Sequence, residues 1–191
     1  MMAGAVWTRA LLVLVVLTSW GSAQAQRREV GYVSASGGWS VLRTDCSVAL
    51  SCDQTAVGAR LVGGLVFSPG LAAEVLVLDF GRGRTRTNDG LVTLHQQTLG
   101  LGTAVQLELG GGLLANFRGG LAASRVGRNF QQSRNTRSDS TAYLDVYGGF
   151  SLLFRMTRDL AVEVSFDATG VEDRVSRDSA AMGSLGLSLR F

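Results

Sequence analysis

The last residues of the chain constrain its fold most strongly, because they alternate between two kinds of side chain. Every second residue there is apolar or small, namely Ala181, Gly183, Leu185, Leu187, Leu189 and Phe191. The residues between them are mostly polar or small. A β-strand turns successive side chains to opposite faces, so the pattern predicts a strand with one apolar face. A soluble sandwich would turn that face inward, whereas a membrane barrel would turn it outward to lipid.

The N-terminus has the features of a secretory signal peptide. Arg9 supplies a positive charge, residues 10–17 form a short apolar run, and the Ala-Gln-Ala sequence at 23–25 matches a cleavage site. The apolar run is too short to cross a bilayer as a helix. We therefore predict export, removal of residues 1–25 and a mature domain of residues 26–191. The alternative is an uncleaved N-terminal anchor.

The composition excludes two other classes of protein. No later segment offers 18 consecutive apolar residues, so no transmembrane helix is predicted. All 18 basic residues are Arg, and loss of Arg9 with the signal peptide lowers the formal charge from +3 to +2. A charge this small gives no argument for nucleic-acid binding. The chain is instead rich in Gly, with 25, and has a single Pro.

Cys46 and Cys52 are the two cysteines of the chain. Their short separation in an exported protein predicts a local disulfide that staples one loop. The spacing is poor for zinc, and no second pair of Cys or His residues accompanies it. We therefore predict neither a metal site nor a cofactor.

Alternation recurs along the mature chain and predicts eight strands. They cover residues 29–39, 55–67, 71–81, 91–107, 113–125, 141–155, 160–168 and 181–191. Short turns alternate with longer polar connections, which lie at 42–54, 82–90, 126–138 and 171–178. This alternation is typical of an up-and-down outer-membrane barrel, and an even strand count places both termini on the short-turn, periplasmic side.

Aromatic residues agree with this interpretation. Phe67, Phe154 and Phe191 share the outward face at the periplasmic strand ends, and Trp39 shares it near the opposite rim. Such residues form the interfacial girdles of membrane barrels. We therefore predict an all-β, eight-stranded, antiparallel transmembrane barrel. A soluble periplasmic β-barrel, with its apolar faces inward, is the structural alternative.

These features resemble the OmpA/OmpX-like family of small eight-stranded outer-membrane barrels. The resemblance covers about residues 29–191 and rests on the alternating Leu185, Leu187 and Leu189 and on Phe191. It implies that these four residues are the signal read by the barrel-assembly machinery. A C-terminal peptidoglycan-binding domain, as in OmpA itself, is not expected, nor is its wall-tethering role. We predict a monomer in the outer membrane.

The predicted lumen is narrow and charged. An eight-stranded barrel is just wide enough for side chains to fill it. Alternation turns six charged residues inward: Arg60, Glu74, Arg118, Asp145, Glu163 and Asp167. Unpaired buried charge is costly, so we expect these groups to pair as a plug, with a narrow ion path as the alternative. Inward glycines are expected to make room for the Arg side chains: Gly100, Gly102, Gly120, Gly149 and Gly186.

Arginines gather in two of the long connections. One group is Arg82, Arg84 and Arg86, and the other is Arg125, Arg128, Arg134 and Arg137. Guanidinium groups pair bidentately with phosphate, so these residues form the hypothesis of a lipopolysaccharide contact. The alternative is that they are ordinary solvated loop residues.

Three residues are considered as a catalytic arrangement. His95 and Asp79 share the outward face near the extracellular ends of adjacent strands, while Ser124 at similar height points inward. The His-x-Ser motif of lipid A deacylase barrels is absent, because Gln96 and Gln97 follow the histidine. We therefore predict a protein that is not an enzyme.

The sequence thus predicts an integral outer-membrane barrel with a structural or surface-interaction role. Its expected partners are outer-membrane lipid, lipopolysaccharide and, during biogenesis, the barrel-assembly machinery, but not nucleic acid. A narrow channel for ions or very small solutes is the first alternative, and a lipid-A-modifying enzyme is the second.

Overall fold

The computed structural model describes residues 30–43, 51–87, 90–132, 135–170 and 179–191, and these segments contain nine strands. They are β1 (Gly31–Arg43), β2 (Ser51–Asp53), β3 (Thr55–Ser68), β4 (Leu71–Thr87), β5 (Gly90–Gly110), β6 (Leu113–Gln132), β7 (Asn135–Arg155), β8 (Leu160–Gly170) and β9 (Ser179–Arg190). The predicted signal peptide lies outside the described residues.

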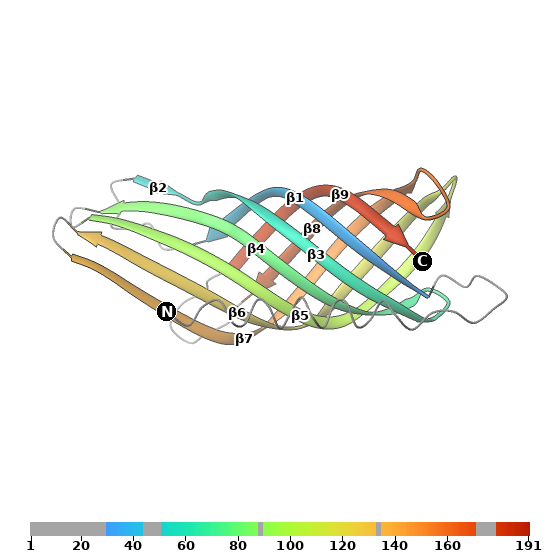
Figure 1. The fold of residues 1–191 in the computed structure, drawn as a ribbon, viewed down its shortest axis with the longest axis horizontal. Helices are drawn as coiled ribbons and strands as arrows, with labels where there is room; N and C mark the ends of the chain where they lie inside the picture. The colour runs from blue at the N-terminus through green and yellow to red at the C-terminus, as the bar shows by residue number, and fades with distance from the viewer. Residues whose placement is uncertain (1–29, 44–50, 88–89, 133–134, 171–178) are drawn as a thin grey trace.

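Eight of these strands form a closed antiparallel ring. The order is β4-β3-β1-β9-β8-β7-β6-β5, and pairing of β4 with β5 closes the sheet. The first strand therefore pairs with the last, from Tyr32 opposite Arg190 to Arg43 opposite Ser179. β2 pairs only with β4 and stands outside the ring. Figure 1 shows the ring as an elongated barrel of steeply tilted strands, and the predicted eight-stranded barrel is confirmed.

The apolar face of the strands points outward. Leu185, Leu187 and Leu189 are each more than half exposed, and Leu144 is 84% exposed. Outward apolar residues of β5 run from Leu99 to Leu109, which matches the roughly 9–11 residues that a tilted strand needs to cross a bilayer. The soluble alternative is contradicted, because it requires these side chains to point into a core.

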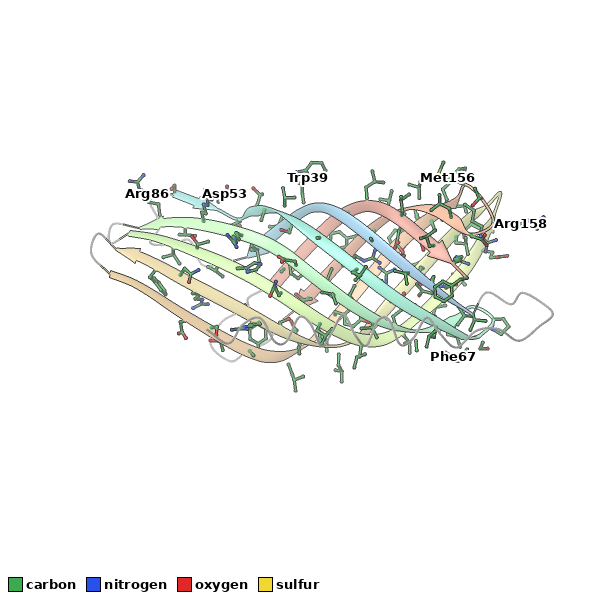
Figure 2. The ribbon with its side chains drawn as sticks, in the orientation of Figure 1. Trp39, Asp53, Phe67, Arg86, Met156 and Arg158 are labelled. Carbon is green, nitrogen blue, oxygen red and sulfur yellow. The ribbon has the colours of Figure 1, made fainter. Side chains whose placement is uncertain are left out.

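Aromatic side chains border this apolar belt. Phe67, Phe154 and Phe191 are all more than half exposed at one end of the barrel, and Trp39 is 78% exposed toward the other. Figure 2 shows Trp39 and Phe67 projecting from the outer surface at different points along the long axis of the barrel. Within the described segments, no helix long and apolar enough to cross a membrane is found.

Three strands extend well beyond the ends that the sequence predicted at the wall. β4 continues to Thr87, β6 continues to Gln132, and β7 begins at Asn135, well before its first pairing with β8, which joins Val146 to Gly170. β5 begins at Gly90, one residue before its predicted start. Figure 1 shows β4, β5, β6 and β7 projecting beyond the other strands. We call this sheet the extended wall: residues 82–87, 90–97, 125–132 and 135–142. Most of the loops predicted at 82–90 and 126–138 are thus paired strands, because Thr, Val and Phe in these segments favour extended backbone.

A β-bulge changes the faces of β4 at the base of the wall. The register shifts between Asp79 and Arg82, so two residues of β4 stand opposite one residue of β5. Gly81 occupies the bulge with a φ of +76°, and a Cβ there would lie 2.2 Å from the carbonyl oxygen of Val57. Glycine is therefore required by backbone conformation and by space. Beyond the bulge, the even-numbered residues turn outward, which exposes Arg82, Arg84 and Arg86.

Replacement of Gly81 with Ala tests the bulge. We expect the free energy of unfolding to fall by about 1–3 kcal/mol, because Ala is strained at this φ. Urea denaturation of the refolded barrel, followed by tryptophan fluorescence, measures the change. Gly183→Ala is the matched control, because a Cβ there meets nothing within 4 Å. Equal stability of the two variants would contradict the account.

Candidate functional site

Two guanidinium groups occupy the middle of the lumen. Arg118 contacts Glu74 through Nε at 3.0 Å, Asp167 through Nη1 at 3.1 Å and Glu163 through Nη2 at 3.4 Å. Arg60 contacts Glu163 through Nη2 at 3.1 Å and Asp167 through Nε at 2.9 Å. All five side chains are at most 1% exposed. They form one network of two cations and three carboxylates, drawn from strands far apart in the sequence.

Neutral groups add hydrogen bonds to this network. The Tyr32 hydroxyl donates to Glu74 Oε1, and Asn116 Nδ2 donates to the same oxygen at 3.2 Å. Arg118 Nη2 donates to Ser151 Oγ at 3.0 Å. Buried charge is tolerated when such partners surround it, and removal of one partner is then costly.

Asp145 does not join the network, although the sequence grouped it with the other five residues. It is buried, and its Oδ1 accepts a hydrogen bond from the backbone N–H of Val146 at 2.8 Å. Arg118 pairs with Gly149, which is four residues away from Asp145 along β7. That separation is about 14 Å along a strand, beyond the reach of the guanidinium.

The inward glycines accommodate other groups than expected. A Cβ on Gly100 would lie 2.8 Å from the Tyr147 ring, and one on Gly102 would lie 2.6 Å from its hydroxyl. A Cβ on Gly149 would lie 2.3 Å from Asp167 Oδ1. These glycines therefore make room for the Tyr147 ring and for the Asp167 carboxylate, not for arginine.

Apolar side chains fill the lumen between the charges and the extended wall. Leu76, Leu78 and Phe80 of β4 are fully buried there, and Met182 of β9 joins the same cluster. An apolar layer above a paired charge layer leaves the middle of the barrel packed.

A second polar cluster lies on the outer surface, at the base of the extended wall. Asp79 Oδ1 contacts His95 Nε2 at 2.9 Å and accepts from the Gly81 backbone N–H at 2.8 Å. Gln97 Nε2 donates to Asp79 Oδ2 at 3.1 Å. Ser124, the nucleophile considered from the sequence, is buried on the opposite face, where its Oγ bonds Thr98 Oγ1 at 2.8 Å.

A cavity of about 300 Å³ opens beside this cluster. We call it the wall cavity, and its lining includes His95, Gln97, Arg125, Gly127, Asn129 and Ser140. His95 pairs with Gly127, which pairs in turn with Ser140, so one row across three strands has no side chain at its centre. This missing side chain creates the hollow. Asp139 also borders the cavity.

One arginine, Arg125, lines the cavity, and three more lie on β4, to one side of it on the outward face of the wall. Arg82 lies opposite His95 on the neighbouring strand, and Arg84 and Arg86 follow outward along β4. We call these three residues and Arg125 the arginine patch. Asp53 of β2 lies opposite Arg84, and hydrogen bonds from the Thr55 hydroxyl and backbone N–H hold its carboxyl pKa below the usual value.

The remaining predicted site residues lie elsewhere or outside the described part of the chain. Arg128 is opposite Asp139 and directly follows Gly127, which faces outward. Because successive side chains of a strand point to opposite faces, Arg128 lies on the inner face of the wall. Arg134 and Cys46 lie outside the described residues, as do the side chains of Arg137 and Cys52. The loop disulfide therefore stays a prediction. Among the described residues, no group of three or more His, Cys, Asp or Glu side chains could hold a metal ion.

Comparisons with known proteins agree with the barrel. The model of the protein family described as OmpA-like transmembrane domain matches residues 26–191. No curated protein sequence matches the chain significantly.

Several solved membrane barrels share the fold. Neisserial surface protein A is 11% identical with a TM-score of 0.62, covering 84% of this chain and 97% of that one. Ail of Yersinia pestis is 14% identical with a TM-score of 0.54, covering 84% and 99%. The N-terminal barrel of OprF from Pseudomonas aeruginosa is 13% identical with a TM-score of 0.53, covering 85% and 98%. At these identities the likeness shows the fold alone.

Replacement of Arg118 with Met tests the lumen network. The variant leaves the carboxylates Glu74, Asp167 and Glu163 without their shared cation, so we expect the free energy of unfolding to fall by about 3–5 kcal/mol. Urea denaturation of the refolded protein measures the loss. Arg155→Met is the matched control, because its pair with Glu108 is partly exposed and is expected to contribute less than about 1 kcal/mol. Similar losses in both variants would contradict a buried, mutually dependent network.

Proposed function

Because this chain belongs to the OmpA-like transmembrane domain family and is an outer-membrane barrel embedded in lipid, we propose that it supports the envelope and contacts lipopolysaccharide through the arginine patch. The observation that carries the proposal is the place of the patch on the outer surface, directly beyond the apolar belt. In an irregular solvated loop, cationic side chains are not expected to line up on the outward face of a sheet.

The height of the patch supports a contact with lipid headgroups. Arg125 is two residues beyond Ala123, which pairs with Leu99 at the edge of the apolar belt. Two residues of a strand tilted by about 45° rise roughly 5 Å. The headgroup layer on each side of the hydrocarbon core is about 5–8 Å thick. The patch therefore begins within that layer, where the phosphates of lipopolysaccharide lie.

The charge of the outer wall also favours an anionic partner. The patch presents four guanidinium groups, and the described carboxylates beside it are Asp79, Asp53 and Asp139. Guanidinium groups bind phosphate in a planar, bidentate way that ammonium groups cannot copy. The wall thus offers more cationic than anionic groups to the outer leaflet.

The packed lumen supports this surface role over the alternative of a narrow channel. Phe80, Leu78 and Met182 are fully buried across the barrel, above a layer of paired charges. The burial of Ser124 inside the lumen likewise favours a protein that is not a lipid-A hydrolase, since its hydroxyl faces away from His95.

The double variant Arg84→Gln/Arg86→Gln tests the lipopolysaccharide contact. Each cation near an anionic membrane surface contributes about 1 kcal/mol, so we expect affinity for lipopolysaccharide micelles to fall roughly 30-fold. Titration of the purified barrel at low salt measures it. The charge-matched control Arg155→Gln/Arg158→Gln lies at the other end of the barrel, where Figure 2 labels Arg158, and should retain affinity. Equal affinities in both double variants would refute the proposal.

A further inference from the structure

We propose that the wall cavity is a binding site for one phosphorylated sugar headgroup of the outer leaflet. This inference rests on the proposed function, because the same leaflet must contact the arginine patch. It adds a distinct claim: one saturable site of defined stoichiometry, in place of a diffuse attraction between cations and a membrane surface.

The position of the cavity favours a lipid headgroup over a soluble ligand. Its lowest row contains Gln97 and Arg125, one row beyond the apolar belt, and its next row contains His95, Gly127 and Ser140. The cavity opens on the outward face, so molecules of the outer leaflet surround its mouth. A headgroup at this depth is already concentrated beside the site, whereas a soluble ligand would have to displace it.

The groups around the cavity suit a phosphate beside sugar hydroxyls. Arg125 is exposed and donates through Nη2 to Ser140 Oγ at 3.4 Å, a long bond that a phosphate oxygen can replace. A guanidinium has five N–H donors in a planar fork, which fits phosphate. Asn129 offers both a donor and an acceptor at the same opening. The Asp139 carboxylate also borders the cavity; it repels a phosphate but can accept from a sugar hydroxyl.

Asp79 fixes the role of the histidine. The carboxylate also accepts from Gln97 and Gly81, and as an acceptor it requires a hydrogen on His95 Nε2. In the tautomer whose one ring hydrogen is on Nε2, Nδ1 is an acceptor, which is suited to a sugar hydroxyl. Phosphate and hydroxyl groups together are found on phosphorylated sugars, while inorganic phosphate or an alkyl phosphate would use only the Arg125 side of the cavity.

The size of the cavity limits the ligand to one headgroup. A volume of about 300 Å³ is at the lower end of the range for small-molecule sites. It accommodates a phosphate with part of a sugar ring and leaves the acyl chains outside, against the apolar belt. Leu99 and Leu121 lie exposed on that belt directly below the site.

Gly127 offers a direct way to fill the cavity. A Cβ on this residue would meet only the His95 carbonyl oxygen, at 3.9 Å, and its φ is not in the left-handed region. Gly127→Leu therefore occupies the hollow without backbone strain. Gly170→Leu is the matched control, because that glycine at the end of β8 also has open space around it and does not border the cavity.

The experiment uses the mature protein in nanodiscs of zwitterionic phospholipid, titrated with bisphosphorylated lipid A and observed by native mass spectrometry. We expect the wild type and Gly170→Leu to bind one molecule saturably. Gly127→Leu and Arg125→Gln should each lower the affinity for this one lipid A molecule at least about tenfold, as expected for loss of a hydrogen bond to a charged group. Fully dephosphorylated lipid A should bind the wild type at least about tenfold more weakly. On detergent gels, unboiled samples of each variant should migrate like the unboiled wild type, which checks that each variant is folded.

Three outcomes would overturn the inference. Wild-type binding by Gly127→Leu, with weakened binding by Arg84→Gln/Arg86→Gln, would remove the cavity site and leave the proposed function standing. Unchanged binding in all these variants would remove both. Displacement of lipid A by millimolar inorganic phosphate would assign the cavity to a soluble anion and contradict the headgroup site.

Discussion

The structure depends on the pairing of its first strand with its last, because lipid offers no hydrogen-bond partner to an open sheet edge. Val30 and Gly31 both donate to the carbonyl oxygen of Phe191, at 2.8 and 3.0 Å, and β1 follows β9 from there. A ring of eight strands leaves a lumen only as wide as the side chains that fill it. The inward residues must therefore satisfy one another, and the outward residues must suit hydrocarbon.

In the lumen, this constraint limits which residue types can occupy the inward positions of the strands. Arg118 can be buried because Glu74, Glu163 and Asp167 converge on it from two other strands. Tyr147 can be buried because glycines of β5, two strands away in the ring, leave room for its side chain. Each large or charged side chain in the lumen thus needs a small or complementary residue on another strand, which links the composition of one strand to that of the others.

Alternation alone predicted the eight strands of the ring, though not β2, and the facing of residues such as Arg60, Leu144 and Phe191. It could not predict which inward charges meet, because contact depends on height in the barrel as well as on face, and Asp145 lies too far from Arg118. It also missed the bulge at Gly81. A glycine within a strand is a signal for a bulge, but this chain has 25 glycines and most of them cause no register shift. The sequence grouped the arginines by predicted loop. In the structure these segments are strands, so the arginines are grouped by the face of the sheet on which they lie.

The central claim concerns which residues of β4 point outward. Odd-numbered residues point outward up to Asp79, and even-numbered residues point outward beyond the bulge, which turns the arginines of β4 to the outer leaflet. Nitroxide labels placed singly along β4, in the barrel reconstituted in lipid, measure this by their accessibility. The account predicts oxygen access at Ala73, Val75 and Val77, and access of a water-soluble relaxant at even positions from Arg82 onward. Access at odd positions through Thr85 would contradict the bulge, and lipid exposure of Leu76 and Leu78 would contradict the barrel's inward and outward faces.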